Sequence, residues 1–286
     1  MLREIRDLGF EYAELSHGIR ISLLPGILDA VNAGEMKIST LHNFCPLPMG
    51  VNHAAPNVYR FSAEKDSERE SALKHTRKTL EFAVRVKARL VVLHMGNIEI
   101  KDYTGKLKKM LGAGGKEAPD YQKLAAEAEK VRNAKKGPFM ARMYDTLQKF
   151  LPEAESLGLK LGVENRESLE EIPLDADFPE FFRKMTSPAV CYWHDTGHAQ
   201  IKQNLGFIDH AQQLQTLAPR LAGFHIHDVQ FPAKDHCPPG SGMVDFASLK
   251  PVVKPEHIKV FEFSPGMTPE DARKGVAHVK AIWGEE

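Results

Sequence analysis

The sequence is poor in cysteine. Its three cysteines lie far apart in a chain of 286 residues and form no Cys-x-x-Cys pair; they are Cys45, Cys191 and Cys237. An odd and sparse set of this kind indicates free thiols in a reducing compartment and argues against a disulfide framework.

Long apolar runs and an excess of charge of one sign are also missing. No apolar segment approaches the ~20 residues that a membrane-spanning helix needs. Residues 1–10 are charged and lack the apolar core of a signal peptide. Lys and Arg together number 38, as do Asp and Glu, so no net positive field is available to attract polyanions. We therefore expect a cytoplasmic protein with neither a membrane nor a nucleic-acid partner.

Short β-rich runs alternate with helical patterns along almost the whole chain. Some runs are nearly continuous in apolar residues, as in residues 90–93, which is typical of parallel strands covered on both faces. The expected strands are 12–15, 37–41, 89–94, 159–164, 189–193, 221–225 and 258–263, and the expected helices between them include 67–87, 138–157, 208–217 and 268–283. This alternation predicts an α/β fold with a parallel sheet.

The ends of the expected strands favour a TIM barrel over an open sheet. No Gly-x-Gly-x-x-Gly follows the first strand, so the commonest signal of a dinucleotide-binding open sheet is missing. Polar residues end nearly every strand, namely Glu14, His42, His94, Glu164, Asp195, His225 and Glu262. A barrel brings its C-terminal strand ends together around one centre, whereas an open sheet spreads them along a line. We therefore predict a TIM (β/α)8-type barrel.

The expected barrel has one strand fewer than its type. The chain opens with a helical pattern at residues 2–8 and contains seven expected strands. Either the first strand is absent from this sequence, or its start is wrongly assigned, or the barrel is incomplete. We predict a single domain over residues 1–286. Its enlarged loops, at about 44–66 and 97–136, follow strands and would overhang the active-site mouth, as decoration or as a lid that excludes water.

Four of the strand-end residues form a candidate metal site: Glu164, Asp195, His225 and Glu262. Three carboxylates and one imidazole make a mostly oxygen shell, which suits Mn²⁺ or Mg²⁺ better than a thiolate-loving metal, with Co²⁺ or Zn²⁺ as alternatives. A divalent cation would also neutralise the mutual repulsion of the carboxylates. We expect one divalent metal ion per chain.

At these residues the chain resembles the xylose isomerase-like TIM barrels, a family of sugar and sugar phosphate isomerases and epimerases distantly related to endonuclease IV. The resemblance rests on Gly-Phe-Glu-Tyr-Ala-Glu-Leu-Ser at 9–16, Asp-Thr-Gly-His at 195–198, His-Ile-His-Asp at 225–228, Pro-Pro-Gly-Ser-Gly at 238–242 and Glu-Phe-Ser at 262–264. It implies the same four ligands, and it implies that His198 binds substrate or sits beside the metal. Because many barrels of this kind form dimers or tetramers, the resemblance also allows a homo-oligomer.

The resemblance implies a specific chemistry. In the ketose epimerase members the two ligand glutamates also act as acid and base, so Glu164 and Glu262 are the expected catalytic residues. One would remove a proton beside the substrate carbonyl to give an enediolate, and the other would return it at a different face or carbon. The expected function is a metal-dependent isomerase or epimerase of carbohydrate metabolism, acting on a small ketose, sugar phosphate or keto acid.

Two other enzyme functions remain open. A polyol-ketone dehydratase would share the enolisation step and then expel water. An endonuclease IV-like enzyme acting on abasic DNA would use more ligands, for which His42, His94 and His236 stand at suitable places, but the aspartate expected two positions before His236 is Lys234. A lysine there would repel a metal, and the chain carries no net positive charge for DNA.

The remaining polar residues are expected to line the substrate pocket. We assign His42, His94, His236 and Arg166 to substrate binding together with His198. The Arg166 guanidinium suits a substrate oxyanion, and a surface ion pair is an equally good interpretation. A binding module without chemistry is the third kind of function, and the presence of both glutamates argues against it.

Overall fold

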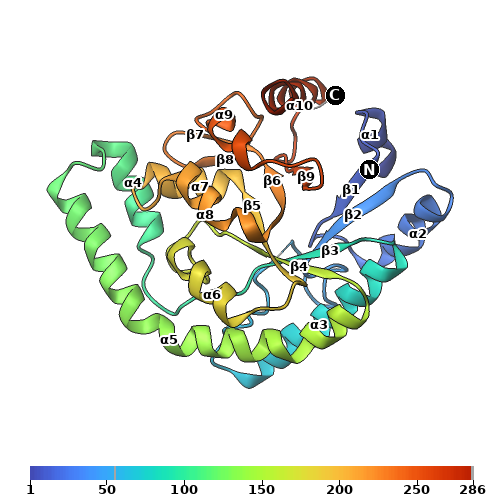
Figure 1. Cartoon of the computed structure of the whole chain (residues 1–286), viewed down its shortest axis with the longest axis horizontal. Coiled ribbons are helices and arrows are strands. Elements are labelled where there is room, and N and C mark those ends of the chain that lie inside the picture. The colour runs from blue at the N-terminus through green and yellow to red at the C-terminus, as the bar shows by residue number, and fades with distance from the viewer. Residues whose placement is uncertain (55, 285–286) are drawn as a thin grey trace. The chain divides into compact units, whose positions relative to one another are not determined.

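The computed structural model describes residues 1–54 and 56–284, so Ala55, inside the expected loop at 44–66, and the last two residues of the expected domain lie outside the described residues. Seven strands make one sheet in the order β1-β2-β3-β4-β5-β6-β9 (Figure 1). Their bounds are β1 Tyr12–Leu15, β2 Lys37–His42, β3 Leu90–Leu93, β4 Lys160–Glu164, β5 Val190–Asp195, β6 Leu221–Ile226 and β9 Ile258–Phe261. Each of the seven overlaps a strand expected from the sequence.

Helices follow most of the strands. Their bounds are α1 Leu2–Asp7, α2 Leu24–Asn32, α3 Asp66–Arg85, α4 Thr104–Gly114, α5 Pro119–Ser156, α6 Phe178–Lys184, α7 Thr196–Asn204, α8 His210–Leu217, α9 Phe246–Leu249 and α10 Pro269–Trp283. Short 3-10 turns lie at Ile21–Leu23, Asp175–Asp177, Ala218–Arg220 and Lys250–Val252. Within the described ranges the chain opens with helix α1, and the sheet has the seven strands that the sequence predicts.

The chain divides into two compact units. The first contains residues 1–97, 138–164 and 185–191, and the second contains residues 98–137, 165–184 and the chain from Tyr192 onward. The first unit therefore holds β1 to β4 with α1 to α3, and the second holds most of β5 with β6 and β9 and their helices.

In the first unit, parallel strands are buried beneath helix α3. Leu90 of β3 pairs with Thr40 of β2 on one side and with Lys160 of β4 on the other. The apolar residues of β3 are at most 1% exposed, as expected for a strand covered on both faces. Helix α3 turns Leu80 and Ala83 into the core, and its Arg77 donates to Glu153 of α5 at 2.9 Å.

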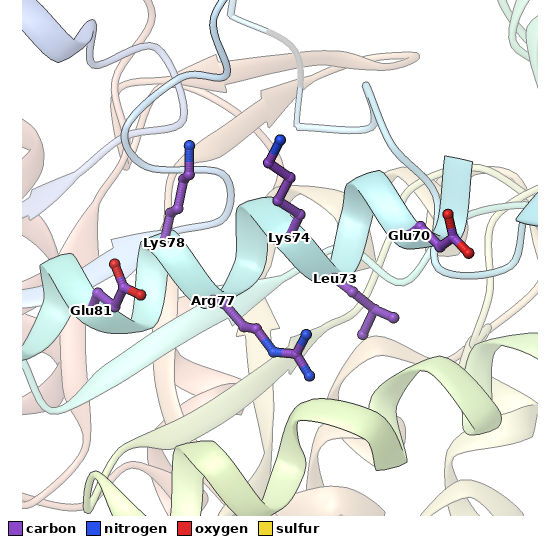
Figure 2. A pocket seen from close by; sticks show the side chains of 6 residues that line it. All are labelled: Glu70, Leu73, Lys74, Arg77, Lys78 and Glu81. Carbon is purple, nitrogen blue, oxygen red and sulfur yellow. The ribbon is translucent and has the colours of Figure 1, made fainter. Parts of the chain in front are cut away.

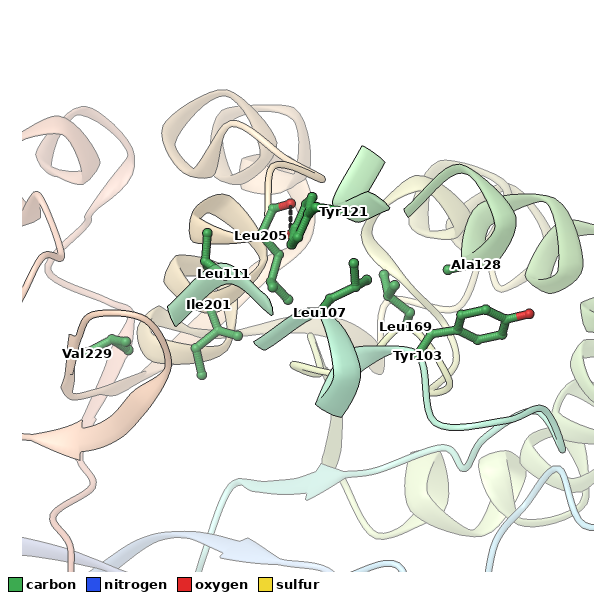
Figure 3. Close-up of a cluster of buried hydrophobic side chains, with 9 residues drawn as sticks. All are labelled: Tyr103, Leu107, Leu111, Tyr121, Ala128, Leu169, Ile201, Leu205 and Val229. Carbon is green, nitrogen blue, oxygen red and sulfur yellow. Dashed lines mark hydrogen bonds between the residues drawn. The ribbon is translucent and has the colours of Figure 1, made fainter. Parts of the chain in front are cut away.

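In the second unit, the expected loop at 97–136 is largely helical. It forms α4 and the N-terminal half of α5, whose apolar side chains pack against α7 (Figure 3). Leu107 of α4 and Ile201 of α7 are fully buried in this cluster. The hydroxyl of Tyr121 donates to the carbonyl of Leu205 at 2.8 Å. These helices share a packed hydrophobic core. Residues 97–136 therefore fit an ordered part of the framework better than a mobile lid.

A short antiparallel hairpin follows β6 and is absent from the sequence expectations. Strands β7 (Asp228–Gln230) and β8 (Lys234–Cys237) pair with Asp228 opposite Cys237. The hairpin has only a few residues per strand and carries charged positions, so neither periodicity nor apolar runs distinguish it from a loop. It carries His236, one of the predicted site residues.

Among the described residues, no helix combines the length and the apolar composition that a membrane crossing requires.

The buried histidines of the second unit make a prediction about pH. Burial lowers the pKa of His257 to about 4, with Glu256 opposing and Lys259 and Lys254 adding to the shift. The pKa of a histidine in the unfolded chain is about 6.5, so between pH ~6.5 and ~4 the unfolded chain binds more protons than the folded one. The stability that the neutral His257 contributes above pH ~6.5 is therefore lost as the pH falls towards 4. His210, fully buried, has its pKa lowered to about 4 as well and acts in the same direction.

The variant His257→Asn isolates one of these groups. His257 accepts from the backbone N–H of Lys254 through Nδ1 at 3.2 Å, and an asparagine oxygen can take the same bond without titrating. We expect the pH dependence of the unfolding free energy between pH ~6.5 and ~4 to weaken by up to about one bound proton. Urea unfolding of both proteins across this range measures it; parallel curves would contradict the assignment, whatever the offset between them.

Candidate metal centre

In the first unit, three predicted site residues meet at the ends of adjacent strands. His42 is the last residue of β2, His94 follows β3 by one residue, and Glu164 is the last residue of β4. His94 Nε2 lies 2.6 Å from Glu164 Oε2 and 3.1 Å from His42 Nε2, and His42 Nε2 lies 3.7 Å from Glu164 Oε2. All three side chains are buried. Parallel pairing places C-terminal strand ends at one edge, which is why residues so distant in sequence converge.

The hydrogen bonds of the two imidazoles point their lone pairs toward Glu164. His42 Nδ1 lies 2.9 Å from the carbonyl oxygen of Asn43, which can only accept, so Nδ1 carries the proton and Nε2 is the acceptor in the neutral ring. His94 Nδ1 lies 3.1 Å from Asn57 Oδ1. With the Asn57 amide in this orientation its oxygen accepts, so the neutral His94 ring also carries its proton on Nδ1 and has its lone pair on Nε2. Two imidazole lone pairs and a carboxylate then face one another, an arrangement that a divalent cation or a shared proton stabilises.

The loop between β2 and α3 is anchored beside His94. Ser62 donates through its hydroxyl to the carbonyl of Asn97 at 2.8 Å and accepts from the Asn97 N–H at 3.0 Å. Gly96 has φ +115°, and a Cβ there would lie 2.3 Å from the Ser62 hydroxyl, so only glycine permits this approach. The anchored loop includes Asn57, and we infer that it fixes the Asn57–His94 contact.

In the second unit, three of the four predicted metal ligands come together. Asp195 ends β5, His225 lies near the end of β6, and Glu262 follows β9 by one residue. His225 Nδ1 lies 3.3 Å from Glu262 Oε2 and 3.9 Å from Asp195 Oδ2. Asp195 and His225 are fully buried, whereas the Glu262 side chain is 33% exposed. Two carboxylates and an imidazole at this separation offer the donor types that divalent metals bind.

Hydrogen bonds to both its backbone and its carboxylate hold Asp195 in place. The side chain of Asn165 accepts from the Asp195 N–H at 2.6 Å and donates to the Asp195 carbonyl at 3.0 Å. The carboxylate caps helix α7 by accepting from the N–H of His198 at 2.7 Å. It also lies 3.1 Å from His227 Nε2. Asn165 therefore positions Asp195.

His198 and Arg166, both predicted to bind substrate, lie beside one another. His198 Nδ1 is 3.5 Å from Asp195 Oδ2 and 3.3 Å from a terminal nitrogen of Arg166. Arg166 donates through Nε to Glu171 at 2.9 Å, and both side chains are largely buried. The guanidinium thus forms an ion pair, which is largely buried and not at the surface as the sequence suggested, and its role in substrate binding stays a prediction.

His236 lies between two carboxylates. Its Nδ1 is 3.2 Å from Asp235 and its Nε2 is 3.7 Å from Glu262. Burial lowers the pKa of His236, but the contacts with Asp235 and Glu262 outweigh burial and raise it to about 11. The ring stacks on His227 with centroids 4.2 Å apart and planes 6° from parallel. The structure thus places a positive charge next to Glu262.

One site residue had no usable sequence signal. Asn57 lies in a Pro/Asn-rich loop whose conformation no periodicity reports, and the contact from Asn57 to His94 spans 37 positions. Asn165 follows Glu164 in the sequence, which predicts that it lies near the site. Its hydrogen bonds to the backbone of Asp195 could not be predicted from that position. His227 had a weak signal, because side chains alternate along a strand and His227 follows His225 by two residues.

A surface hollow elsewhere in the first unit has a different character. Figure 2 shows it along α3, lined by six side chains of that one helix: Glu70, Leu73, Lys74, Arg77, Lys78 and Glu81. Its charged residues are of both signs, and Arg77 is paired with Glu153. The predicted site residues lie in the two buried clusters and not in this hollow.

Comparison with known proteins settles the family. A family described as Xylose isomerase-like TIM barrel matches residues 2–282. The chain belongs to this family. The family assignment and the strand order together confirm the predicted α/β barrel class. No curated protein matches the chain in sequence.

Solved structures agree in fold at low sequence identity. The D-psicose 3-epimerase determined in the presence of D-fructose is 16% identical, with a TM-score of 0.68 over 99% of this chain and 92% of that one. The 3-keto-D-glucoside 4-epimerase YcjR of E. coli is 15% identical, with a TM-score of 0.68 over 98% and 92%. The IolI protein with a binding zinc atom is 15% identical, with a TM-score of 0.60 over 99% and 91%. At these identities the similarity shows the fold.

The packing of Gly197 against His227 makes a prediction about stability. A Cβ at Gly197 would lie 2.0 Å from Cε1 of the His227 ring, which is fully buried and bonded to Asp195. We expect Gly197→Ala to displace the ring and to lower the free energy of unfolding by roughly 1–3 kcal/mol. Gly26→Ala, in α2, is the control, because nothing lies within 4 Å of its Cβ position and alanine favours a helix. Urea unfolding that showed equal stability for the two variants would contradict this packing.

Proposed function

We propose that the protein is a divalent-metal-dependent isomerase or epimerase of a small ketose or related sugar. The observation that carries the proposal is the placing of acids and an imidazole at the ends of consecutive strands. Glu164, Asp195, His225 and Glu262 stand at or next to the C-terminal ends of β4, β5, β6 and β9, which are neighbours in the strand order. Members of the family's fold include epimerases of D-psicose and of a 3-keto-D-glucoside, which supports a carbonyl-bearing sugar as substrate.

The chemistry of the donors fits a divalent cation. The second unit alone holds two carboxylates beside His225, with Asp195 shielded from solvent. Carboxylates that lie close together repel one another, and a divalent cation between them would relieve that repulsion. We propose that Glu164 completes this set. The oxygen-rich composition favours Mn²⁺ or Mg²⁺.

Glu164 and Glu262 are the proposed base and acid. Glu164 is buried against the two imidazoles of the first unit, so a proton it accepts can be shared with His94 at 2.6 Å. Glu262 is partly exposed and faces the charged ring of His236. One glutamate removes the proton from the carbon next to the substrate carbonyl, and the other returns a proton to a different face or to the neighbouring carbon. When bound, the metal supplies positive charge that stabilises the negative charge developing on the carbonyl oxygen.

The cluster in the first unit favours one alternative. His42 and His94 direct lone pairs at Glu164, as a further metal ion would require, and an endonuclease IV-like enzyme would use such a metal. Lys234 argues against it, since it stands where that branch has an aspartate and its ammonium group is exposed beside Gln230. The metal count separates the two functions.

Metal content is the first test. We expect about one Mn or Mg per chain by elemental analysis of the purified protein, and loss of it in Asp195→Ala. Phe231→Ala, at an exposed apolar position of the hairpin, is the control and should keep the metal. Two or more zinc ions per chain would favour the endonuclease alternative, and no metal after reconstitution would refute the proposed centre.

The two glutamates are tested by proton exchange. Wild-type protein with its metal should exchange the carbon-bound proton of a ketose with D₂O and form the epimer or the aldose. Glu164→Gln and Glu262→Gln should each lower the rate at least about 100-fold, because amides neither accept nor return the proton. Glu99→Gln, which makes the same change at an exposed glutamate after β3, is the control. NMR of the substrate follows both exchange and product, and substantial residual exchange in both variants would refute the mechanism.

A further inference from the structure

We infer that His227 is a positioning residue of the metal centre, which orients the carboxylate of Asp195 through an Nε2–H donor fixed by the β7–β8 hairpin. The inference rests on the proposed function for its link to metal binding. The hydrogen bonding itself belongs to the second unit alone and does not depend on a metal.

The tautomer of His227 follows from one backbone bond. The N–H of His236 lies 2.9 Å from His227 Nδ1, and a backbone N–H can only donate. Nδ1 therefore accepts, and the neutral ring carries its proton on Nε2, which lies 3.1 Å from the Asp195 carboxylate. A second proton on Nδ1 would face the His236 N–H, so the geometry favours the neutral ring.

The ring has no freedom to leave this position. His227 is fully buried, and its backbone is tied to Thr196: the N–H donates to the Thr196 hydroxyl at 3.1 Å, and that hydroxyl donates to the His227 carbonyl at 2.7 Å. Gly197 lies against one part of the ring, where a Cβ would come within 2.0 Å. The His236 ring stacks on it in parallel.

Asp228 holds in place the backbone segment whose His236 N–H fixes the tautomer of His227. Its two carboxylate oxygens accept four backbone N–H groups, from Val229 at 2.8 Å and from Gly240, Gly242 and Val244 at 2.9 Å each. Asp228 also pairs with Cys237 in the hairpin, next to His236. The buried carboxylate thus ties the loop after β8 back onto β7 and holds the strand that bears the His236 N–H.

The consequence is that Asp195 is oriented on one side by protein donors. Its carboxylate accepts from the N–H of His198 and from His227, and its Oδ2 lies 3.9 Å from Nδ1 of His225, a proposed ligand. Nε2 of His227 carries a proton and Nδ1 is occupied, so His227 is not itself a ligand. His227 belongs to two of the residue groups that could hold an ion, one with Asp195 and His198 and one with His236 and Glu262. In neither group can it then serve as a ligand. Orienting partners of this kind typically change metal affinity 10–100-fold.

The tautomer is tested on the metal-free wild-type protein. Long-range ¹H–¹⁵N spectra of protein labelled with ¹⁵N-histidine distinguish Nδ1–H from Nε2–H rings, and the His227 signals are assigned as those missing in His227→Gln. We expect a neutral ring protonated on Nε2 at neutral pH. A ring protonated on Nδ1, or on both nitrogens, would overturn the inference whether or not a metal binds.

Two matched variants test the link to the metal. Glutamine places an N–H donor near the position of Nε2, whereas asparagine reaches only the position of Nδ1 and can accept from His236 without reaching Asp195. We expect His227→Asn to weaken Mn²⁺ binding to the metal-free protein about 10–100-fold, and His227→Gln to stay within a few-fold of wild type. Calorimetric titration with Mn²⁺ measures the affinity, and thermal unfolding without metal reports the structural cost of each substitution.

The outcomes separate the two proposals. If wild type binds no Mn²⁺, the proposed function fails, while the tautomer measurement still decides the role of His227. If wild type binds Mn²⁺ and the two variants lose affinity equally, or neither does, His227 does not act through its Nε2–H donor and the inference fails.

Discussion

The burial of the Asp195 carboxylate is the constraint on which the surrounding structure depends. A charged group with no exposure to solvent must be surrounded by donors or cations, or the cost of desolvation would unfold the site. The three residues that follow Asp195 in the Asp-Thr-Gly-His segment each meet part of that requirement. Thr196 bonds the backbone of His227, Gly197 leaves room for its ring, and His198 caps the carboxylate with its N–H. The motif therefore positions the buried carboxylate of Asp195 through its own neighbours in sequence.

The first unit meets a related constraint by a different route. Glu164 is also buried, but its neighbours are imidazoles whose outer nitrogens are occupied by Asn43 and Asn57. An imidazole held in this way offers only a lone pair to the carboxylate. Glu164 thus faces the lone pairs of two imidazoles, whereas Asp195 accepts from the His198 N–H and lies 3.1 Å from His227 Nε2.

The parts of this fold that could be predicted from sequence are those set by local pattern. Apolar runs such as residues 90–93 gave β3, and polar residues at strand ends gave the candidate ligands, because parallel strands align their C-terminal ends. The β7–β8 hairpin and the helices of residues 97–136 were missed, since short charged strands and a lysine-rich segment resemble loops until tertiary packing selects a structure. Asn57 could not be predicted, because its role exists only once the anchored loop brings it to His94. The roles of individual site residues likewise depend on hydrogen-bond direction, which spacing does not report.

The environments of the two glutamates bear on the proposed chemistry. Glu164 is enclosed, with its nearest proton partner an imidazole 2.6 Å away. Glu262 is a third exposed and lies beside His236, whose pKa of about 11 keeps it charged at neutral pH. A carboxylate next to a fixed cation and solvent exchanges its proton with water readily, whereas an enclosed one must pass its proton to a neighbour. Under the proposed mechanism, a proton taken by Glu262 would be lost to solvent and one taken by Glu164 would be retained. The two faces of the substrate would therefore differ in how much solvent hydrogen they acquire, and this asymmetry follows from burial alone.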